Sequence, residues 1–191
     1  MGNAAEELPR KLKLDVHEYH RMAEAGVLDA HRRVELIHGE IIEMPPVGPL
    51  HVNLVNRLNR TLTRAVGELA VVSVQNPVLL PEHSEPEPDL VLLRPEADAR
   101  PTELPAASDT LLVVEVADTT LRHDRDVKVP LYAGHGVPEV WLVEVRARRI
   151  VRFREVRDGA YGSRDVPSLR SPLALLAASD IAVDLSRLFD G

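Results

Sequence analysis

Cysteine is absent from this chain of 191 residues. Its absence excludes thiol catalysis, disulfide bonds and cysteine-based zinc sites, so any metal must be held by oxygen ligands or histidine. No apolar run approaches the length of about eighteen residues that a membrane-spanning helix needs. The first residues, Met1 to Pro9, also lack the apolar segment of a signal peptide. We therefore expect a soluble, cytoplasmic protein with no membrane partner.

Lysine is scarce as well. From Leu14 onward Lys128 is the only lysine, and arginine fills every other basic position. A guanidinium is always charged, whereas the pKa of an ammonium can be shifted, so the two are not interchangeable where a proton or a water is handled. Lys128 is therefore a candidate catalytic residue. The competing interpretation is that a rare residue stands at this position by chance.

Basic residues are fewer than acidic ones, and the net charge is −7. This charge argues against a general nucleic-acid coat protein, because such binding needs many Lys and Arg side chains to neutralise phosphates. It leaves room for a local basic patch. A hydrophobic content of 45% is enough for one domain with its own core. We expect an N-terminal tail at residues 1–13 and a single domain at residues 14–191.

Helical and strand patterns alternate along the chain. Three segments are predicted to be helical, namely Asp15–Gly26, Leu50–Val66 and Val127–Ala133. A hairpin is expected at Arg33–Met44 with His38-Gly39 as its turn, and strands at Ala70–Val74, Val78–Leu80, Asp89–Leu93, Leu111–Val116, Glu139–Val145 and Arg149–Arg154. The connector Arg94–Asp109 is expected to be a loop with at most one turn of helix. This alternation predicts an α/β domain with a mixed sheet.

Glu115 is the strongest local anomaly, because it stands inside the apolar run Thr110–Ala117. A strand of this kind is typical of a sheet that is buried on both faces. An ionised carboxylate there costs several kcal/mol unless it is paired, protonated or bound to a cation. The alternatives are that this face of the sheet meets solvent or that an arginine such as Arg122 pairs with Glu115.

Asp89 stands at the start of its predicted strand, whereas Glu115 stands near the end of the next one. If the two strands pair antiparallel, both carboxylates lie at the same edge of the sheet. Convergent carboxylates repel unless a cation lies between them, and Mg²⁺ favours one or two carboxylates with waters and substrate phosphate. The implied chemistry is phosphodiester hydrolysis. Taken alone, an aspartate that follows a proline is more often a turn residue.

An ordered set of fragments resembles a known family. Pro88-Asp89, Glu115 and a nearby lysine are the elements of the PD-(D/E)XK nuclease signature. The fragments are Val34–Glu40, Pro49–His51, Pro86–Val91, Val113–Val116, Asp124–Lys128 and Tyr132–Val143. Their order and spacing resemble the Uma-two family, a former domain of unknown function that is classed with the restriction endonucleases. The resemblance covers roughly Leu14 to Arg154, and Ala182–Phe189 is similar to the family's C-terminal end.

The resemblance implies a restriction-endonuclease-like core, in which an N-terminal helix and β-hairpin precede a mixed central β-sheet flanked by helices. Asp89 would be the first metal-binding acid and Glu115 the second. The usual lysine position, two residues after the glutamate, holds Ala117, so Lys128 of the following helix would orient or polarise the attacking water. Asp118 stands where the family more often has serine, and its charge either adds a ligand or weakens the approach of phosphate.

His51 is a further candidate, because its spacing from Val55 and Leu58 places it on the inward face of its helix. A core histidine bonded to a backbone carbonyl is the commoner interpretation. The family's histidine at this place implies an active-site position that contacts metal-bound water or phosphate. Pro130 is tolerated only near the start of a helix, so the helix of Lys128 is expected to begin near residues 126–129 or to kink there.

Other acidic and basic residues are weaker candidates. Asp124 is expected to be a cap or a partner of Lys128 rather than a ligand. Glu35 and Glu40 lie on a predicted edge strand, where glutamates are usually solvated, although Glu35 could reach the metal in a closed site. The basic stretch Arg146–Arg157 is typical of a solvated strand face, and it is one place where arginines could meet DNA phosphates.

The leading hypothesis is an Mg²⁺-dependent (or Mn²⁺-dependent) DNA endonuclease with Asp89, Glu115, Lys128 and His51 as its catalytic residues. A homodimer is the simplest assembly for cutting both strands of a duplex. The alternative is a weakly active or inactive protein of this fold that serves as a nucleic-acid-binding or assembly module. A histidine-led hydrolase is disfavoured, because no serine or cysteine nucleophile stands in a recognisable motif.

Overall fold

The computed structural model describes residues 11–29 and 31–190. Most of the expected N-terminal tail, residues 1–10, lies outside these ranges, as do positions 30 and 191. The described residues fall into two compact units. The first contains the residues up to Met44 together with Pro81–Glu85, and the second contains Pro45–Leu80 and the residues from Pro86 onward. The expectation of one domain over residues 14–191 stays a prediction.

The first unit begins with helix α1 (Val16–Glu24), as the sequence predicts. The Asp15 carboxylate accepts a hydrogen bond from the Glu18 amide at 2.7 Å, and the Glu18 carboxylate accepts one from the Asp15 amide at 3.0 Å. This reciprocal capping box satisfies amides that have no partner within the helix. Gly26 ends the helix at a φ of +70°, which glycine adopts without a steric penalty.

The hairpin of the first unit consists of β1 (Val34–Ile37) and β2 (Glu40–Glu43). Both turn residues, His38 and Gly39, have positive φ, as a two-residue hairpin turn requires. Glu40 is exposed and pairs with Lys13 at 2.7 Å. Glu35 is buried, so the expectation that it is solvated is wrong. The segment Pro81–Glu85 lies against its strand, where the Glu85 amide donates to the Leu36 carbonyl.

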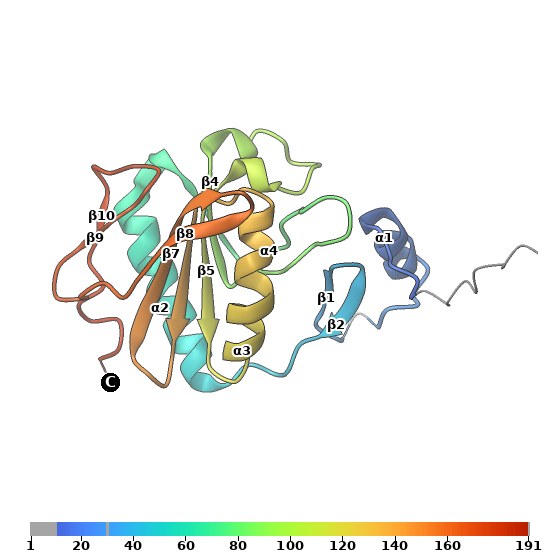
Figure 1. Cartoon of the computed structure of the whole chain (residues 1–191), viewed down its shortest axis with the longest axis horizontal. Helices are drawn as coiled ribbons and strands as arrows, with labels where there is room; N and C mark the ends of the chain where they lie inside the picture. Colours follow the sequence, from blue (N-terminus) through green and yellow to red (C-terminus); the bar gives the residue numbers. More distant parts are fainter. Residues whose placement is uncertain (1–10, 30, 191) are drawn as a thin grey trace, which may run out of the picture. The chain divides into compact units, whose positions relative to one another are not determined.

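The second unit is built on a six-stranded sheet within the described ranges, in the order β3-β4-β5-β6-β7-β8 (Figure 1). Its strands are β3 (Val71–Val74), β4 (Leu90–Leu93), β5 (Thr110–Ala117), β6 (Glu139–Glu144), β7 (Arg149–Arg157) and β8 (Ala160–Asp165). Only β5 and β6 pair parallel, and all other neighbours are antiparallel. The mixed sheet that the sequence predicts is therefore confirmed. A parallel pair needs a crossover connection, and helices supply it here.

Helix α2 (Pro49–Val66) covers one face of the sheet. Its apolar stripe packs with alternate residues of the central strands, including Leu90, Val114 and Val116, and with β9 (Leu173–Ala174) and β10 (Ala182–Val183). The crossover helix contains α3 (Leu121–His123), a π-helical segment (Asp124–Lys128) and α4 (Val129–Gly134). Side chains alternate between the faces of a strand, so the contact of this helix with Glu115, described below, places it on the opposite face.

Some predicted boundaries are wrong. Where a strand Val78–Leu80 was expected, the structure has isolated bridge residues at Leu79 and Leu80, with Leu79 opposite Ala106. The crossover helix begins at Leu121 rather than near residue 127. Strands β8, β9 and β10 are additional to those predicted, although the Asp158-Gly159 turn before β8 has a typical hairpin sequence.

Three 3₁₀ turns complete the elements, at Gly67–Leu69, Pro95–Ala97 and Ala107–Asp109. The last two lie in the connector 94–109, so this connector has two short helical turns where the sequence predicts a loop with at most one. Among the described ranges, no helix combines the length and the apolar character of a membrane span.

Candidate active site

The two candidate carboxylates lie side by side at one end of the sheet. Strands β4 and β5 pair antiparallel with Leu90 opposite Val114, so the next pair along the ladder is Asp89 and Glu115. Directly opposite residues of an antiparallel pair present their side chains on the same face. The predicted antiparallel pairing is therefore confirmed, and its register places both acids at the same end of the two strands. Both side chains are buried.

Lys128 compensates the buried charge of Glu115. Its Nζ lies 2.8 Å from Glu115 Oε1, and only 1% of the lysine side chain is exposed. The Tyr132 hydroxyl donates a second hydrogen bond to the same oxygen at 2.5 Å. The alternative in which Arg122 pairs with Glu115 is wrong, because Arg122 lies 94% exposed beside Asp126. The one lysine that the sequence retains after Leu14 is thus a fully buried cation.

A π-helical turn carries Lys128 to this position. The Val129 amide donates to the carbonyl of Asp124, five residues earlier, instead of to the residue four earlier. A proline ring clashes with the carbonyl four residues before it and offers no amide proton. The widened turn directly before Pro130 accommodates that ring within a helix that continues to Gly134. Turns of this kind are frequent at functional sites.

Asp89 is held by three donors. Its Oδ2 accepts from the Val116 amide at 2.8 Å, and Gln75 Nε2 approaches Oδ1 at 3.4 Å. His51 Nε2 lies 2.9 Å from the same Oδ1. The histidine comes from the first turn of α2 and points inward, as the helical spacing predicts. Its other ring nitrogen, Nδ1, is buried without a hydrogen-bond partner among the described residues.

Asp124 is a third buried carboxyl group in this region. Thr120 Oγ1 donates to its Oδ2 at 2.5 Å. Burial raises the pKa of Asp124, the Lys128 charge and the Thr120 hydrogen bond lower it, and the Asp89 charge raises it further. Asp124 is therefore an electrostatic neighbour of Lys128, in agreement with the expected partnership.

Two other positions bear on the site. Ala117 is buried at the end of β5 and offers no functional group where nucleases of this type usually have lysine. Asp118 is partly exposed and lies 3.3 Å from the guanidinium of Arg146, which offsets its negative charge. Tyr132, Gln75 and Thr120 were not singled out from the sequence. Tyr132 could have been, because a residue four positions after Lys128 lies on the same helix face.

Asp89 and Glu115 are carboxylates, which are donors of the kind that Mg²⁺ takes. Among residues 11–29 and 31–190, no group of three or more His, Asp or Glu side chains has the arrangement of a protein-only metal cage. Mg²⁺ does not need such a cage, because it usually keeps several waters and takes one or two carboxylates. A carboxylate has about four lone-pair sites, so one that accepts hydrogen bonds from the protein can also bind a cation.

Comparisons with known proteins agree on the fold. A family model described as "Putative restriction endonuclease", Uma2, matches residues 16–186. The chain is similar to a solved structure titled as a "putative nuclease belonging to DUF820" from Anabaena variabilis, with a TM-score of 0.70 and 14% sequence identity. That similarity covers 92% of this chain and 97% of the other, and at this identity it bears on the fold alone. No curated protein matches.

Proposed function

The chain belongs to the Uma2 family, and from this premise we propose that it is a Mg²⁺-dependent DNA endonuclease, with Mn²⁺ as an alternative ion. The observation that carries the proposal is the buried Lys128–Glu115 pair beside Asp89. A buried ion pair with this geometry is costly to assemble and is weak evidence for stability alone. Two adjacent acids with a lysine are the groups that phosphodiester hydrolysis needs.

Asp89 and Glu115 would hold the ion. When bound, Mg²⁺ would acidify a water and neutralise charge on the scissile phosphate. Because Glu115 fixes the ammonium of Lys128 at 2.8 Å, the lysine charge would lie at a defined place relative to the attacking water and the scissile phosphate. Tyr132 helps to fix Glu115 through its hydroxyl.

His51 would hold a proton at a defined atom. In the neutral tautomer that donates from Nε2 to Asp89, the Nδ1 atom is an acceptor. Nδ1 is buried and has no hydrogen-bond partner among the described residues, so it would receive a proton from a water that enters the site together with the ion or the substrate. We propose this role for His51, in addition to contact with phosphate. A homodimer would supply two such sites for the two strands of a duplex.

The alternative function is an inactive module that binds nucleic acid. It is favoured by the double occupancy of Glu115 Oε1, which accepts from both Lys128 and Tyr132. A carboxylate oxygen with two donors is a poorer cation ligand than one without them. The same experiment separates the two functions.

The test is the nicking of supercoiled plasmid with Mg²⁺ or Mn²⁺. The endonuclease proposal expects cleavage by the wild type and loss of cleavage in Lys128→Met. Lys13→Met is a matched control, because Lys13 also lies 2.7 Å from a glutamate but is partly exposed. Equal cleavage by wild type and Lys128→Met would overturn the catalytic assignment. Duplex binding without cleavage under either metal would favour the inactive module.

A further inference from the structure

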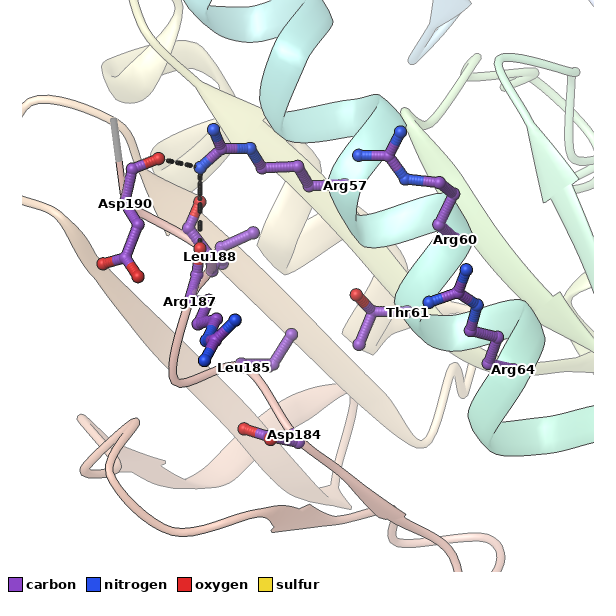
Figure 2. Close-up of a pocket in the computed structure, with 9 residues that line it drawn as sticks. All are labelled: Arg57, Arg60, Thr61, Arg64, Asp184, Leu185, Arg187, Leu188 and Asp190. Carbon is purple, nitrogen blue, oxygen red and sulfur yellow. Dashed lines mark hydrogen bonds between the residues drawn. The ribbon is translucent and has the colours of Figure 1, made fainter.

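A second cluster of charge lies on the α2 side of the sheet, away from the carboxylate pair. Helix α2 and the segment after β10 line a pocket of about 630 Å³ (Figure 2). Arg60 and Arg64 line it from the helix, and Arg187 lines it from the C-terminal segment. Glu115 faces the opposite side of the sheet, so this pocket is not part of the candidate active site.

The composition of α2 is unusual for this chain. The protein has a net charge of −7, yet this helix of 18 residues contains three arginines and no aspartate or glutamate. Arg57, Arg60 and Arg64 are spaced by three and four residues, which places them on one face. Like charges at this spacing repel each other, and the helix has no acid to offset them. A bound anion would offset them.

One of these arginines already has acceptors. Arg57 Nη1 donates to the carbonyl of Leu188 at 3.1 Å and also to that of Asp190. Arg148 donates to the neighbouring carbonyl of Phe189. These two arginines hold the C-terminal segment, and Arg57 fixes it against α2. They thereby fix the backbone next to Arg187.

The remaining arginines have few intramolecular partners. No hydrogen-bond acceptor is described for the side chains of Arg60 and Arg64, which are exposed. Asp184 lines the pocket, and its pKa is lowered chiefly by hydrogen bonds from Ser186 and to a smaller extent by the charge of Arg187. In Figure 2 the carboxylates of Asp184 and Asp190 lie on the C-terminal side of the pocket, so the helix side is cationic.

The other basic stretch of the chain, Arg146–Arg157, differs because several of its arginines have carboxylate partners. Arginines on β7 are paired with carboxylates inside the unit, as Arg149 with Glu144, Arg152 with Asp165 and Arg154 with Glu139, each within 2.7 Å. Their charge is therefore neutralised locally. The exposed arginines of α2 are therefore better placed to meet phosphates than the paired arginines of this stretch.

We propose that Arg60, Arg64 and Arg187 form a phosphate-binding pocket. A guanidinium presents a planar fork of donors that matches the oxygens of a phosphate and bonds them in pairs. Thr61 lines the same pocket from the helix and can add a hydroxyl donor. The recognised group is a phosphate, carried either by a small molecule or by a nucleic-acid backbone. The proposal is independent of the metal chemistry at Asp89.

The test compares two double variants with equal loss of charge. Arg60→Gln/Arg64→Gln removes the two helical arginines of the pocket, and Arg21→Gln/Arg170→Gln removes two exposed arginines elsewhere. Glutamine has a helix propensity close to that of arginine, so α2 should remain intact, which circular dichroism checks. Arg60→Lys/Arg64→Lys keeps the charge but loses the fork, and it should bind with intermediate strength.

Binding is measured by calorimetry with inorganic phosphate at constant ionic strength, and by fluorescence anisotropy with a short DNA duplex in EDTA. We expect the pocket variant to bind at least one of these ligands about tenfold more weakly per arginine removed. For the duplex, the slope of log K against log salt should fall by about two. The control variant should bind like the wild type.

The two arms identify the source of the phosphate. Weaker binding of inorganic phosphate indicates a pocket for a small phosphorylated ligand, whereas weaker binding of the duplex alone indicates a backbone contact. If the pocket and control variants bind equally weakly, the effect comes from net charge alone and the proposal is overturned. Failure of the wild type to bind either ligand would overturn it as well.

Discussion

Neutralising both members of the Lys128–Glu115 pair should preserve the fold and abolish activity. Neutralising one member should reduce the stability of the fold as well as the activity. The two side chains are 1% and 4% exposed, so solvent screens neither charge. Removing one partner of a buried pair leaves an uncompensated charge and costs about 3–5 kcal/mol of unfolding free energy. We expect a loss of this size for Lys128→Met.

The single variant Glu115→Gln should lose less unfolding free energy than Lys128→Met. In Glu115→Gln the ammonium of Lys128 still has Asp124 as an electrostatic neighbour, and the Tyr132 hydroxyl can still donate to the amide oxygen. In Lys128→Met, by contrast, the Glu115 carboxylate loses the cation that lies 2.8 Å from it. The loss of stability should therefore be smaller for Glu115→Gln than for Lys128→Met.

The double variant Lys128→Met/Glu115→Gln buries no charge at this position. Replacing both members of a buried pair with neutral residues of similar volume is often neutral or stabilising. We expect its stability to lie within about 1 kcal/mol of the wild type, so the coupling energy between the two sites should be at least about 2 kcal/mol. All three variants should fail to nick plasmid, because each lacks a proposed catalytic group.

Urea unfolding of the four proteins measures the cycle, and thermal unfolding gives an independent check. A loss of 3–5 kcal/mol in a domain of this size lowers Tm by roughly 6–20 °C. Lys13→Met/Glu40→Gln is the exposed control, and it should leave stability close to that of the wild type. Additive losses in the buried double variant, or a loss below about 1 kcal/mol for Lys128→Met, would refute the buried-pair argument.

Three further predictions concern single groups. Tyr132→Phe removes a donor from the Glu115 carboxylate and should cost about 1.5–3 kcal/mol in urea unfolding, while an unchanged midpoint would contradict that bond. Asp89→Ala should weaken Mg²⁺ binding in calorimetry, and equal binding by wild type and variant would show that the acidic pair is not the metal site. Burial raises the pKa of Glu85 despite the opposing charge of His20, so the folded state holds the proton more tightly than the unfolded state. Stability should therefore fall as pH rises from the ordinary Glu pKa through the raised one, and Glu85→Gln should lose this part of the pH dependence in unfolding curves at several pH values.

Much of the fold could be predicted from local sequence. Three features depend on only a few neighbouring residues and can be predicted from the sequence: the capping box at Asp15, the positive-φ turn at Gly39 and the apolar spacing of α2. The π-helical turn before Pro130 could not be predicted from the sequence. The sequence signalled a difficulty there, but whether a proline ends, kinks or widens a helix depends on what the helix packs against.

The candidate site was partly predictable for the same reason. A carboxylate in an apolar strand requires a partner, so Glu115 was conspicuous, and the antiparallel order of the two strands placed Asp89 beside it. The partners themselves come from distant parts of the chain. Tyr132 and the His51 contact with Asp89 depend on how helices on two faces meet the end of the sheet.

The sequence by itself determined that the chain has no thiol chemistry, that it forms an α/β fold of the Uma2 family, and that Glu115, if buried, must be paired, protonated or bound to a cation. Only the tertiary structure decided that Lys128 supplies this cation and that the strand arginines 149–154 are neutralised by nearby acids. Tertiary structure also exposed the arginines of α2 in a pocket. The physical reason is that composition and spacing fix which groups are costly to bury, whereas the packing of distant segments fixes which groups meet.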